Sequence, residues 1–468
     1  MKNNGSSEKK ENKRILKLWK KFNAMFVLVL LLLIFSGYSI FIACKLNKGY
    51  IPDEIYRYEV VKHFETTWGI PNDVPITLTT GEDLHRNPYL GYWIFGRVLN
   101  IIDVFSPQGT DWQDLVALRI ANWLFSFGAV IFTYLISKAI IKNKWLQLLP
   151  VFMLTNTLMY VFLSGGVSYD NPVNLLCTAG IYFFIRVLKK EDFLNNSLWW
   201  MVFLSIGALI KHTVLPLALI MVVFWIIFII RNRKENKVKP LNKKWLTYCL
   251  LVVLLIFVGL NISLYGVNLI KFHSIRPSCN DTFSNEICQE TVFVKRLKEL
   301  GLSEKLSLHE AIKQGHPDPI RYTFDEWIRE MLKRINGIMG GHNYFPIVVS
   351  YFHIALYWMA LLGFRYIRKP SYKILALLGI FSFYAVVLIY MNYDSELVYG
   401  FNKYIALQGR YIFPVISIAY IMVSHILSKV SNKVIKFGTL GLLILLFLYG
   451  GPIRFIWYYN SVFADWFI

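Results

Sequence analysis

The chain has 468 residues, of which 56% are hydrophobic, and its formal net charge at pH 7 is +21. Soluble domains are usually about 45–50% apolar. Here the excess is gathered into long uncharged blocks, which excludes an ordinary soluble domain and predicts an all-α, polytopic transmembrane helix bundle. The basic residues lie in short segments between these blocks, and no groove-reading motif accompanies them, so nucleic acid is excluded as a partner.

The amino-terminal segment, residues 1–23, is polar and rich in lysine, and it precedes a first apolar block at 24–44. Lys and Arg favour the cytoplasmic side of a membrane, so this tail is predicted to be cytoplasmic. The block is long and no small-residue cleavage site follows it cleanly, so we interpret it as an uncleaved anchor in the cell (plasma) membrane.

The whole chain predicts eleven spans in a transmembrane domain at 24–452, followed by an extracytoplasmic tail at 453–468. The fifth and sixth are separated only by Lys211-His212-Thr213. They could instead form one long broken helix, which would give ten spans and invert the later topology. The eleven-span count keeps the connections rich in Lys and Arg inside, as the positive-inside rule requires. The predicted spans are 24–44, 115–137, 145–163, 171–188, 197–210, 213–230, 246–269, 346–364, 373–391, 410–427 and 436–452.

Two segments on the outer side are long, 45–114 and 270–345. Long connections are uncommon in compact proteins and are usually functional where they occur. The first contains 87–105, which is apolar on one face and is interrupted by Arg97 and Asp103. This pattern predicts a helix that lies in the membrane interface.

The second outer segment contains 303–315, which predicts a helix that begins at Ser303 and ends at Gly315. It also contains Cys279 and Cys288, whose spacing fits neither a zinc site nor a redox motif. A disulfide between them requires an oxidising compartment, and the sequence leaves that pairing open.

Two acidic pairs lie in the first outer segment. Pro52-Asp53-Glu54 follows the first span, where Asp53 could act as a general base towards an acceptor hydroxyl. The alternative is a plain helix start, because Pro and acidic residues both suit the first turn. Glu82 and Asp83 could hold the acceptor, tune the first carboxylate or share a divalent cation with it. Their alternative is a solvated turn.

Two cations map to the same outer side. Lys211 lies between two apolar blocks and could bind a lipid phosphate, or it could be a snorkelling anchor. Gln408-Gly409-Arg410-Tyr411 opens the tenth span, and the guanidinium of Arg410 matches phosphate oxygens in its geometry. The alternative for this motif is an interfacial Arg beside a Tyr of the aromatic belt.

A third polar motif, Ser168-Tyr169-Asp170-Asn171-Pro172, opens the fourth span. Asp170 and Asn171 are suited to capping that helix, and they face the same outer mouth. The histidines show no metal-ligand spacing, so the metal content stays undetermined, and a divalent cation is the one candidate cofactor.

The convergence of these motifs is more informative than any one of them. Asp53, Lys211 and Arg410 are far apart in the sequence, yet the topology maps all three to the outer leaflet. One carboxylate base and two cations at the mouth of a bundle suit the transfer of a group away from a lipid-linked phosphate.

These residues carry a resemblance to a known group of enzymes. From about residue 24 to 430 the chain resembles the type-C glycosyltransferase superfamily, and within it an uncharacterised bacterial multi-span family. The motifs that carry the resemblance are Pro52-Asp53-Glu54, Ser168-Tyr169-Asp170, Lys211 between two spans, and Gln408-Gly409-Arg410-Tyr411 with the following Pro414.

The resemblance implies an enzyme that moves a sugar from a polyprenyl-phosphate-linked donor to a glycan, lipid or protein acceptor at the cell surface. It implies Asp53 as the base, Glu54 as its catalytic neighbour, and Lys211 and Arg410 as ligands of the donor phosphate. Glu82 or Asp83 would match a second acidic site. Arg57, Asp170, Gln408 and Tyr411 complete the candidate set as possible acceptor-side residues, and membrane lipid is a further partner.

Two positions depart from that family. Arg57 stands where a histidine is frequent, and Asn87-Pro88-Tyr89 replaces a His-Pro-Pro run, which leaves the acceptor open. One rival function is a transporter or flippase of lipid-linked sugars, which would need charges near the midplane and often two related halves, and neither is present. The other rival is a non-catalytic envelope assembly protein, which would tolerate loss of each candidate residue.

Overall fold

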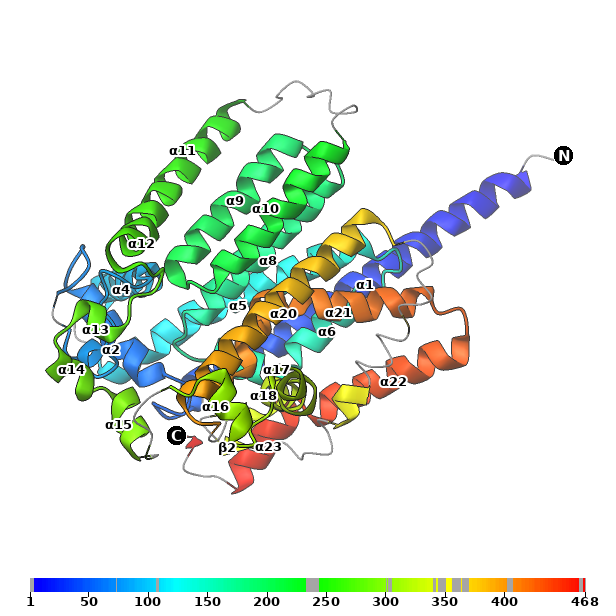
Figure 1. Ribbon diagram of the computed structural model, residues 1–468. Helices are drawn as coiled ribbons and strands as arrows, with labels where there is room; N and C mark the ends of the chain where they lie inside the picture. The colour runs from blue at the N-terminus through cyan, green and yellow to red at the C-terminus, as the bar shows by residue number, and fades with distance from the viewer. Residues whose placement is uncertain are drawn as a thin grey trace.

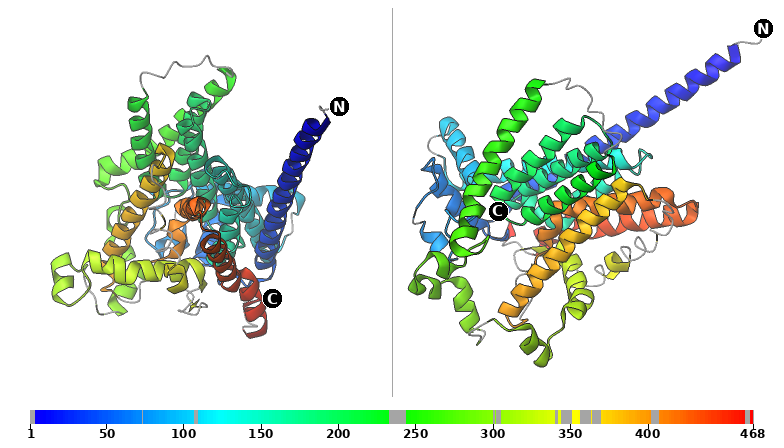
Figure 2. Two further views of the ribbon diagram at one scale, coloured as in Figure 1. Left: turned by 90° about the vertical axis from the view of Figure 1, so that its right-hand side faces the viewer. Right: turned by 45° about the horizontal axis from the view of Figure 1, so that its top comes forward.

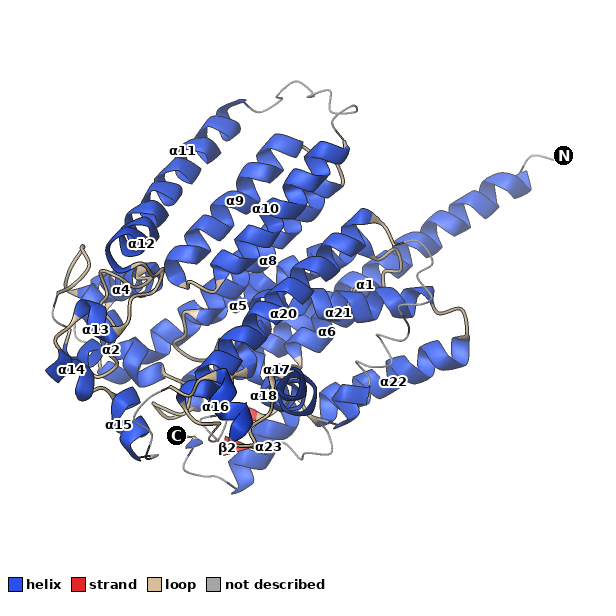
Figure 3. Cartoon of the chain, in the orientation of Figure 1, coloured by secondary structure: helices blue, strands red, loops and turns tan. Residues whose placement is uncertain are grey.

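The computed structural model describes most of the chain, and helices predominate throughout (Figure 3). One short antiparallel pair, β1 (Ile338–Met339) and β2 (His342–Asn343), lies in the second outer segment. The described residues are 4–72, 74–106, 109–232, 244–299, 301, 305–339, 342–343, 351–355, 363, 370–401, 407–462 and 466–467.

Nine helical segments of the described residues are long and apolar enough to cross a membrane. Because helices satisfy their own backbone hydrogen bonds, such segments can lie in hydrocarbon, and the predicted all-α, polytopic bundle is confirmed. They comprise α1 (Asn4–Lys45), α5 (Asp111–Ile140), α8 (Asp170–Leu188), α9 (Phe193–Ile210), α10 (Val214–Arg231), α11 (Lys244–Asn261) continued through η1 (Ile262–Gly266) into α12 (Val267–Phe272), α20 (Tyr372–Val398), η4 (Gly409–Ile412) with α21 (Phe413–Lys429), and α22 (Lys433–Tyr449) with α23 (Pro452–Val462).

Three details of the predicted topology can be compared with these helices. The fifth and sixth predicted spans are two separate helices, α9 and α10, which contact each other, so the hairpin is confirmed over one broken helix. The predicted span 145–163 is instead two short helices, α6 (Leu149–Thr155) and α7 (Leu158–Ser164). Most of the predicted span 346–364 lies outside the described residues.

The break between α6 and α7 has a local cause. Asn156 and Thr157 turn their side chains back onto carbonyls of the preceding turn, with Asn156 Nδ2 donating to Phe152 at 2.9 Å and Thr157 Oγ1 to Met153 at 2.8 Å. Side chains of this kind compete with the helical hydrogen bonds, so a helix tends to end where they gather.

Helix α8 lies in the interior of the bundle, together with the still more buried stretch Gly409–Lys429, and α11 is at the edge of the bundle. In α8, 72% of the most apolar stretch is buried, against 17% for the stretch Lys244–Phe272. α8 packs against α5, α9 and α21, so its amino-terminal end is held from several sides. This end begins at Asp170, one of the candidate residues.

The two outer segments fold at one end of the bundle, away from the amino terminus (Figures 1 and 2). The first holds α2 (Glu54–Glu65), α3 (Pro75–Leu78) and α4 (Leu90–Phe105), so the helix expected at 87–105 is present. The second holds α13 (Cys279–Thr282), α14 (Asn285–Gln289), α15 (Val292–Glu299), α16 (Leu308–Lys313), α17 (Pro319–Arg321), η2 (Tyr322–Trp327) and α18 (Ile328–Asn336).

Two expectations for the second outer segment are resolved. Cys279 and Cys288 form a disulfide, which settles the pairing that the sequence left open. The helix expected from Ser303 begins instead at α16, where Ser307 is the cap and accepts from the amide of Glu310. Gly315 does terminate it, with φ +88.

The carboxyl-terminal end packs against the start of the first outer segment. Leu46 pairs with Phe467 in an isolated bridge, and the amide of Asn47 donates to the carbonyl of Trp466 at 2.9 Å. The ring of Trp466 lies 4.5 Å from that of Tyr50. These contacts fix the chain just before Asp53.

Candidate active site

Asp53 lies in the turn between α1 and α2, in a backbone conformation that few residue types adopt. Its backbone is left-handed, with φ 60 and ψ 13, and its side chain is 50% exposed. Aspartate tolerates this conformation better than most residues, but it still costs about 1–3 kcal/mol. Such strain persists only where surrounding contacts hold it, and here it aims an accessible carboxylate at two arginines.

Those arginines are Arg57, one turn later on α2, and Arg410 of η4. Oδ2 of Asp53 lies 2.5 Å from Nη2 of Arg410 and 3.1 Å from Nη2 of Arg57. Both guanidinium groups are buried, with side chains only 2% exposed. Gly409 makes the approach of η4 possible, because a Cβ there would stand 2.4 Å from the backbone of Arg334.

Asp170 is the second carboxylate of the same site. Its Oδ1 lies 2.5 Å from Nζ of Lys211, and its Oδ2 lies 3.7 Å from both Arg57 and Arg410. We call Asp53, Arg57, Asp170, Lys211 and Arg410 the ion cluster. It brings together residues from the first outer segment, α8, the α9–α10 turn and η4.

The expected capping role of Asp170 and Asn171 is wrong. No side chain caps α8 from its amino-terminal position, and Oγ of Ser168 accepts from the amide of Asp170 at 3.2 Å. The Asn171 side chain donates to the carbonyl of Leu163. Asp170 is drawn away from capping because three cations surround its carboxylate, and charge-assisted contacts are stronger than a neutral cap.

Aromatic rings line the cationic side of the ion cluster. The guanidinium of Arg57 lies 4.1 Å from the ring centre of Tyr169, and Nζ of Lys211 lies 5.4 Å from the same ring. Tyr411 provides a second face, 4.7 Å from Nζ of Lys211. The negative ring faces stabilise these cations where little water reaches them. Lys211 is therefore held inside the site, rather than snorkelling from its rim.

The ion cluster has more positive than negative charge. Three cations face two carboxylates, and the buried Nε groups of Arg57 and Arg410 have no hydrogen-bond partner among the described residues. Buried donors without a partner are uncommon and call for an explanation. An anionic ligand beside the ion cluster would offset the excess positive charge.

Glu54 lies outside the ion cluster, contrary to its expected catalytic role. Its carboxylate forms two bonds with Arg119, at 2.8 and 2.6 Å, and it also accepts from the amides of Val167 and Gly49. Both Glu54 and Arg119 are fully buried. Arg119 in turn donates to the carbonyls of Ala43, Leu46 and Asn47. The pair therefore fixes the end of α1 and the start of α2.

The remaining candidates lie around the ion cluster. Glu82 accepts from the hydroxyl of Tyr56 at 2.7 Å, whereas Asp83 forms the turn expected as its alternative, accepting from the amide of His85. Gln408 contributes its carbonyl to the η4 turn, where it accepts from the amide of Tyr411 at 3.1 Å.

The contacts of Asp53 determine its titration. Burial favours its neutral form, but the guanidinium groups of Arg410 and Arg57 outweigh that effect and hold the pKa of Asp53 below its ordinary value. A lowered pKa stabilises the folded state above the unfolded pKa, and this stabilisation is lost as pH falls through the folded pKa. We expect kcat/KM, which reports the protein before the donor binds, to stay independent of Asp53 protonation at neutral pH, with its acid limb below the ordinary aspartate range. A pH–rate profile in which Asp53→Glu moves the acid limb would check this.

Sequence reasoning missed two residues, Arg119 and Tyr56. Arg119 had a usable signal, because an arginine inside a long apolar block needs a buried partner. Tyr56 had none, since a single tyrosine in an outer segment is common. Within the described ranges no group of three or more His, Cys, Asp or Glu side chains converges as a metal site.

Comparison with known proteins agrees with this architecture. The family model described as dolichyl-phosphate-mannose-protein mannosyltransferase matches residues 90–275. No curated protein matches the chain. Among solved structures, the archaeal oligosaccharyltransferase AglB from Archaeoglobus fulgidus, in complex with an inhibitory peptide and a dolichol-phosphate, is similar with a TM-score of 0.50 and 12% identity.

Two further structures are similar at lower scores. They are ArnT from Cupriavidus metallidurans bound to undecaprenyl phosphate (TM-score 0.47, 12% identity) and the arabinosyltransferase EmbB from Mycobacterium smegmatis (TM-score 0.45, 9% identity). The chain is covered over 93%, 88% and 86% of its length by AglB, ArnT and EmbB, and it spans 55%, 61% and 30% of theirs. The resemblance to the type-C glycosyltransferase superfamily is thus confirmed at the level of the fold.

Proposed function

We propose that this chain, which has the type-C glycosyltransferase fold, transfers a sugar from a polyprenyl-phosphate-linked donor to a hydroxyl acceptor at the outer face of the cell membrane. The observation that carries the proposal is the ion cluster, where an accessible carboxylate stands beside an excess of buried cations. AglB, which shares the fold, is complexed with a lipid-linked phosphate, and this supports the donor class.

The cations of the ion cluster would hold the donor phosphate. Arg410 offers a planar fork with a free Nε, and Lys211 offers a point charge on the opposite side of Asp170. The leaving phosphate gains negative charge as the sugar departs, so cations positioned in advance favour the transition state over the bound donor. Membrane lipid would surround the polyprenyl chain, which enters from the side of the bundle.

Asp53 would be the base of an inverting transfer. The acceptor oxygen bonds to the anomeric carbon while its proton passes to Asp53, and the bond from that carbon to the phosphate oxygen breaks with its electron pair. Two arginines make Asp53 a weak base, because their charge favours the carboxylate. A phosphate bound to Arg410 would offset that charge and raise the pKa of Asp53, so the base would become effective once the donor is bound.

The roles of the other candidates follow from their contacts. Asp170 would neutralise part of the positive charge and orient Lys211. The rings of Tyr169 and Tyr411 both lie against Lys211 and would keep it in place. The amino terminus would be cytoplasmic, and the acceptor would be a glycan, lipid or protein at the cell surface.

The proposal is tested by measuring the release of polyprenyl phosphate, the lipid product of the reaction. The purified chain, reconstituted in vesicles of the lipid extract of its source cells, is expected to liberate free polyprenyl phosphate, measured by mass spectrometry. Surface glycans of a deletion strain should lose a sugar in the same analysis. A flippase would move lipid-linked sugars without releasing any polyprenyl phosphate, so transport without release would overturn the proposal.

A further inference from the structure

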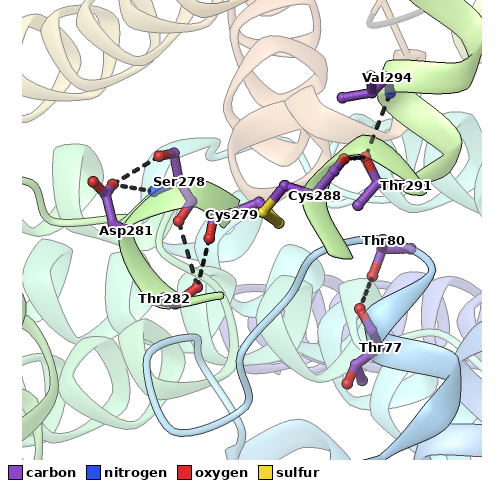
Figure 4. Close-up of a disulfide and its surroundings, with 9 residues drawn as sticks. All are labelled: Thr77, Thr80, Ser278, Cys279, Asp281, Thr282, Cys288, Thr291 and Val294. Carbon is purple, nitrogen blue, oxygen red and sulfur yellow. Dashed lines mark hydrogen bonds between the residues drawn. A yellow bond between two sulfur atoms is a disulfide. The ribbon is translucent and has the colours of Figure 1, made fainter. Parts of the chain in front are cut away.

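A concave site separate from the ion cluster lies between the two outer segments. It is a pocket of about 360 Å³, and Figure 4 shows the segment carrying Thr80 beside the segment that carries the disulfide and Thr291. The volume lies at the lower end of the range of about 300–1,000 Å³ for small-ligand sites. Its chemistry is carried by Glu82, Asn87, Arg276, Asn280, Thr291 and Phe293.

The walls of this pocket are fixed before any ligand binds. The disulfide between Cys279 and Cys288 joins α13 to α14, and both cysteines line the pocket. Across the pocket, Gly81 has φ +68, and a Cβ there would stand 2.8 Å from Sγ of Cys279. The amide of Val292 donates to the carbonyl of Thr79 at 2.9 Å, which ties the two outer segments together. A pocket with fixed walls loses less entropy on binding.

The groups in the pocket suit a neutral molecule that is rich in hydroxyls. Glu82 and Arg276 face each other at 3.4 Å, so their charges cancel, and their side chains are 30% and 54% exposed. An exposed pair of this kind is weak and can exchange its partner for ligand hydroxyls. Asn87, Asn280 and Thr291 offer both donors and acceptors. Phe293, 49% exposed, presents an apolar surface that suits the C–H face of a sugar ring.

The pocket connects to the ion cluster through Tyr56. Its hydroxyl donates to Glu82 at 2.7 Å and accepts from Thr80 at 3.3 Å. Burial and the neighbouring Glu82 carboxylate raise the pKa of Tyr56, so its hydroxyl stays protonated and continues to donate. The next residue on α2 is Arg57, a member of the ion cluster. Helix α2 therefore contacts two residues of the pocket lining through Tyr56 and contributes Arg57 to the ion cluster.

We propose that this pocket binds a neutral mono- or disaccharide unit of the acceptor, and so positions the acceptor hydroxyl towards Asp53. The inference rests on the proposed glycosyl transfer and names the class of its acceptor. The donor sugar is a less suitable occupant, because it is tethered to the phosphate that the buried cations of the ion cluster would hold, whereas the pocket opens among exposed side chains of the outer segments.

Binding can be measured without knowing the acceptor. Saturation-transfer NMR on the purified full chain, with methyl α-glucoside and methyl β-galactoside as probes, is expected to show binding of at least one glycoside. Arg276→Ala should weaken that binding by at least about ten-fold, since a charged hydrogen-bond donor to the ligand is lost. The matched control is Lys295→Ala, because Lys295 is equally exposed, at 54%, and forms one surface ion pair with Glu290 outside the pocket lining.

The outcomes separate the pocket from the reaction. Absence of glycoside binding, or equal loss in Arg276→Ala and Lys295→Ala, would overturn the pocket assignment. Displacement of the glycoside by polyprenyl-phosphate glucose would assign the pocket to the donor and also overturn it, whereas continued binding supports it. Asp53→Asn should retain glycoside binding. A failure of polyprenyl phosphate release in vesicles would instead count against the transfer reaction itself.

Discussion

Replacing Asp53 with asparagine is expected to reduce sugar transfer by about 10²–10⁴-fold, the usual contribution of a general base. Asparagine keeps the size of the side chain and tolerates the left-handed backbone, with φ 60, that this position adopts. It cannot take the proton of the acceptor hydroxyl. The measurement is polyprenyl phosphate release in vesicles, with the amount of folded protein determined by size-exclusion chromatography.

The matched control for that variant is Asp325→Asn. Asp325 also lies in an outer segment and pairs with an arginine, Arg321, at 3.8 Å, but its side chain is 66% exposed and lies outside the ion cluster. The control should transfer sugar at the rate of the unmodified protein. If Asp53→Asn matches its rate, Asp53 is not the base, and the role would pass to Asp170, the other carboxylate of the ion cluster.

Glu54→Gln is expected to lower the free energy of unfolding by about 3–5 kcal/mol, because it leaves the fully buried guanidinium of Arg119 without its counter-charge. Arg119→Met should cost a similar amount, because the buried carboxylate of Glu54 would lose its counter-charge and keep only the backbone amides of Val167 and Gly49 as partners. Arg119→Met also removes the hydrogen bonds that the guanidinium donates to the carbonyls of Ala43 and Leu46 at the end of α1. Chemical unfolding in detergent, followed by tryptophan fluorescence, would measure the loss.

Two further variants show whether the cost comes from burial of a single charge. Glu54→Met combined with Arg119→Met removes both charges and should recover part of the lost stability. Glu191→Gln removes one member of an exposed pair with Arg186, at 3.1 Å, and should cost only about 0–1 kcal/mol. A loss for Glu54→Gln no larger than that for Glu191→Gln would show that the pair does not support the fold.

The different contacts of Asp53 and Glu54 show what could not be predicted from the sequence. The two carboxylates are adjacent, and the sequence assigned both to catalysis. The left-handed backbone at Asp53 turns one side chain towards Arg410 and the other towards Arg119. Their different partners, Arg119 of α5 and Arg410 of η4, come from distant parts of the chain, and no pattern in residues 52–54 specifies them.

The predicted spans succeeded where the signal was local. Apolar runs predicted α1, α5, α8, α9, α10, α20 and α21, among others, because the length and hydrophobicity of each run are properties of that segment alone. The run at 145–163 forms two short helices rather than one continuous helix, because Asn156 and Thr157 bond back to carbonyls of their own helix. The high hydropathy of the whole run hides this local effect in the sequence. Positive charge in the connections predicted the hairpin of α9 and α10 correctly, because the charge of a connection indicates on which side of the membrane the two adjoining helices end.

By itself, the sequence determined that this protein has the apolar segments of a multi-pass membrane protein and that Asp53, Lys211 and Arg410 are the charged residues to consider at one end of its helix bundle. Only the tertiary structure decided that Asp170 joins Lys211 to Arg57 and Arg410, and that Glu54 belongs with Arg119. Membrane residence follows from the free energy of transferring each apolar segment from water to the bilayer. That free energy depends on the residues within the segment itself. Ion pairs between residues as far apart as Asp53 and Arg410 depend on how whole helices pack, and that packing is not a local property.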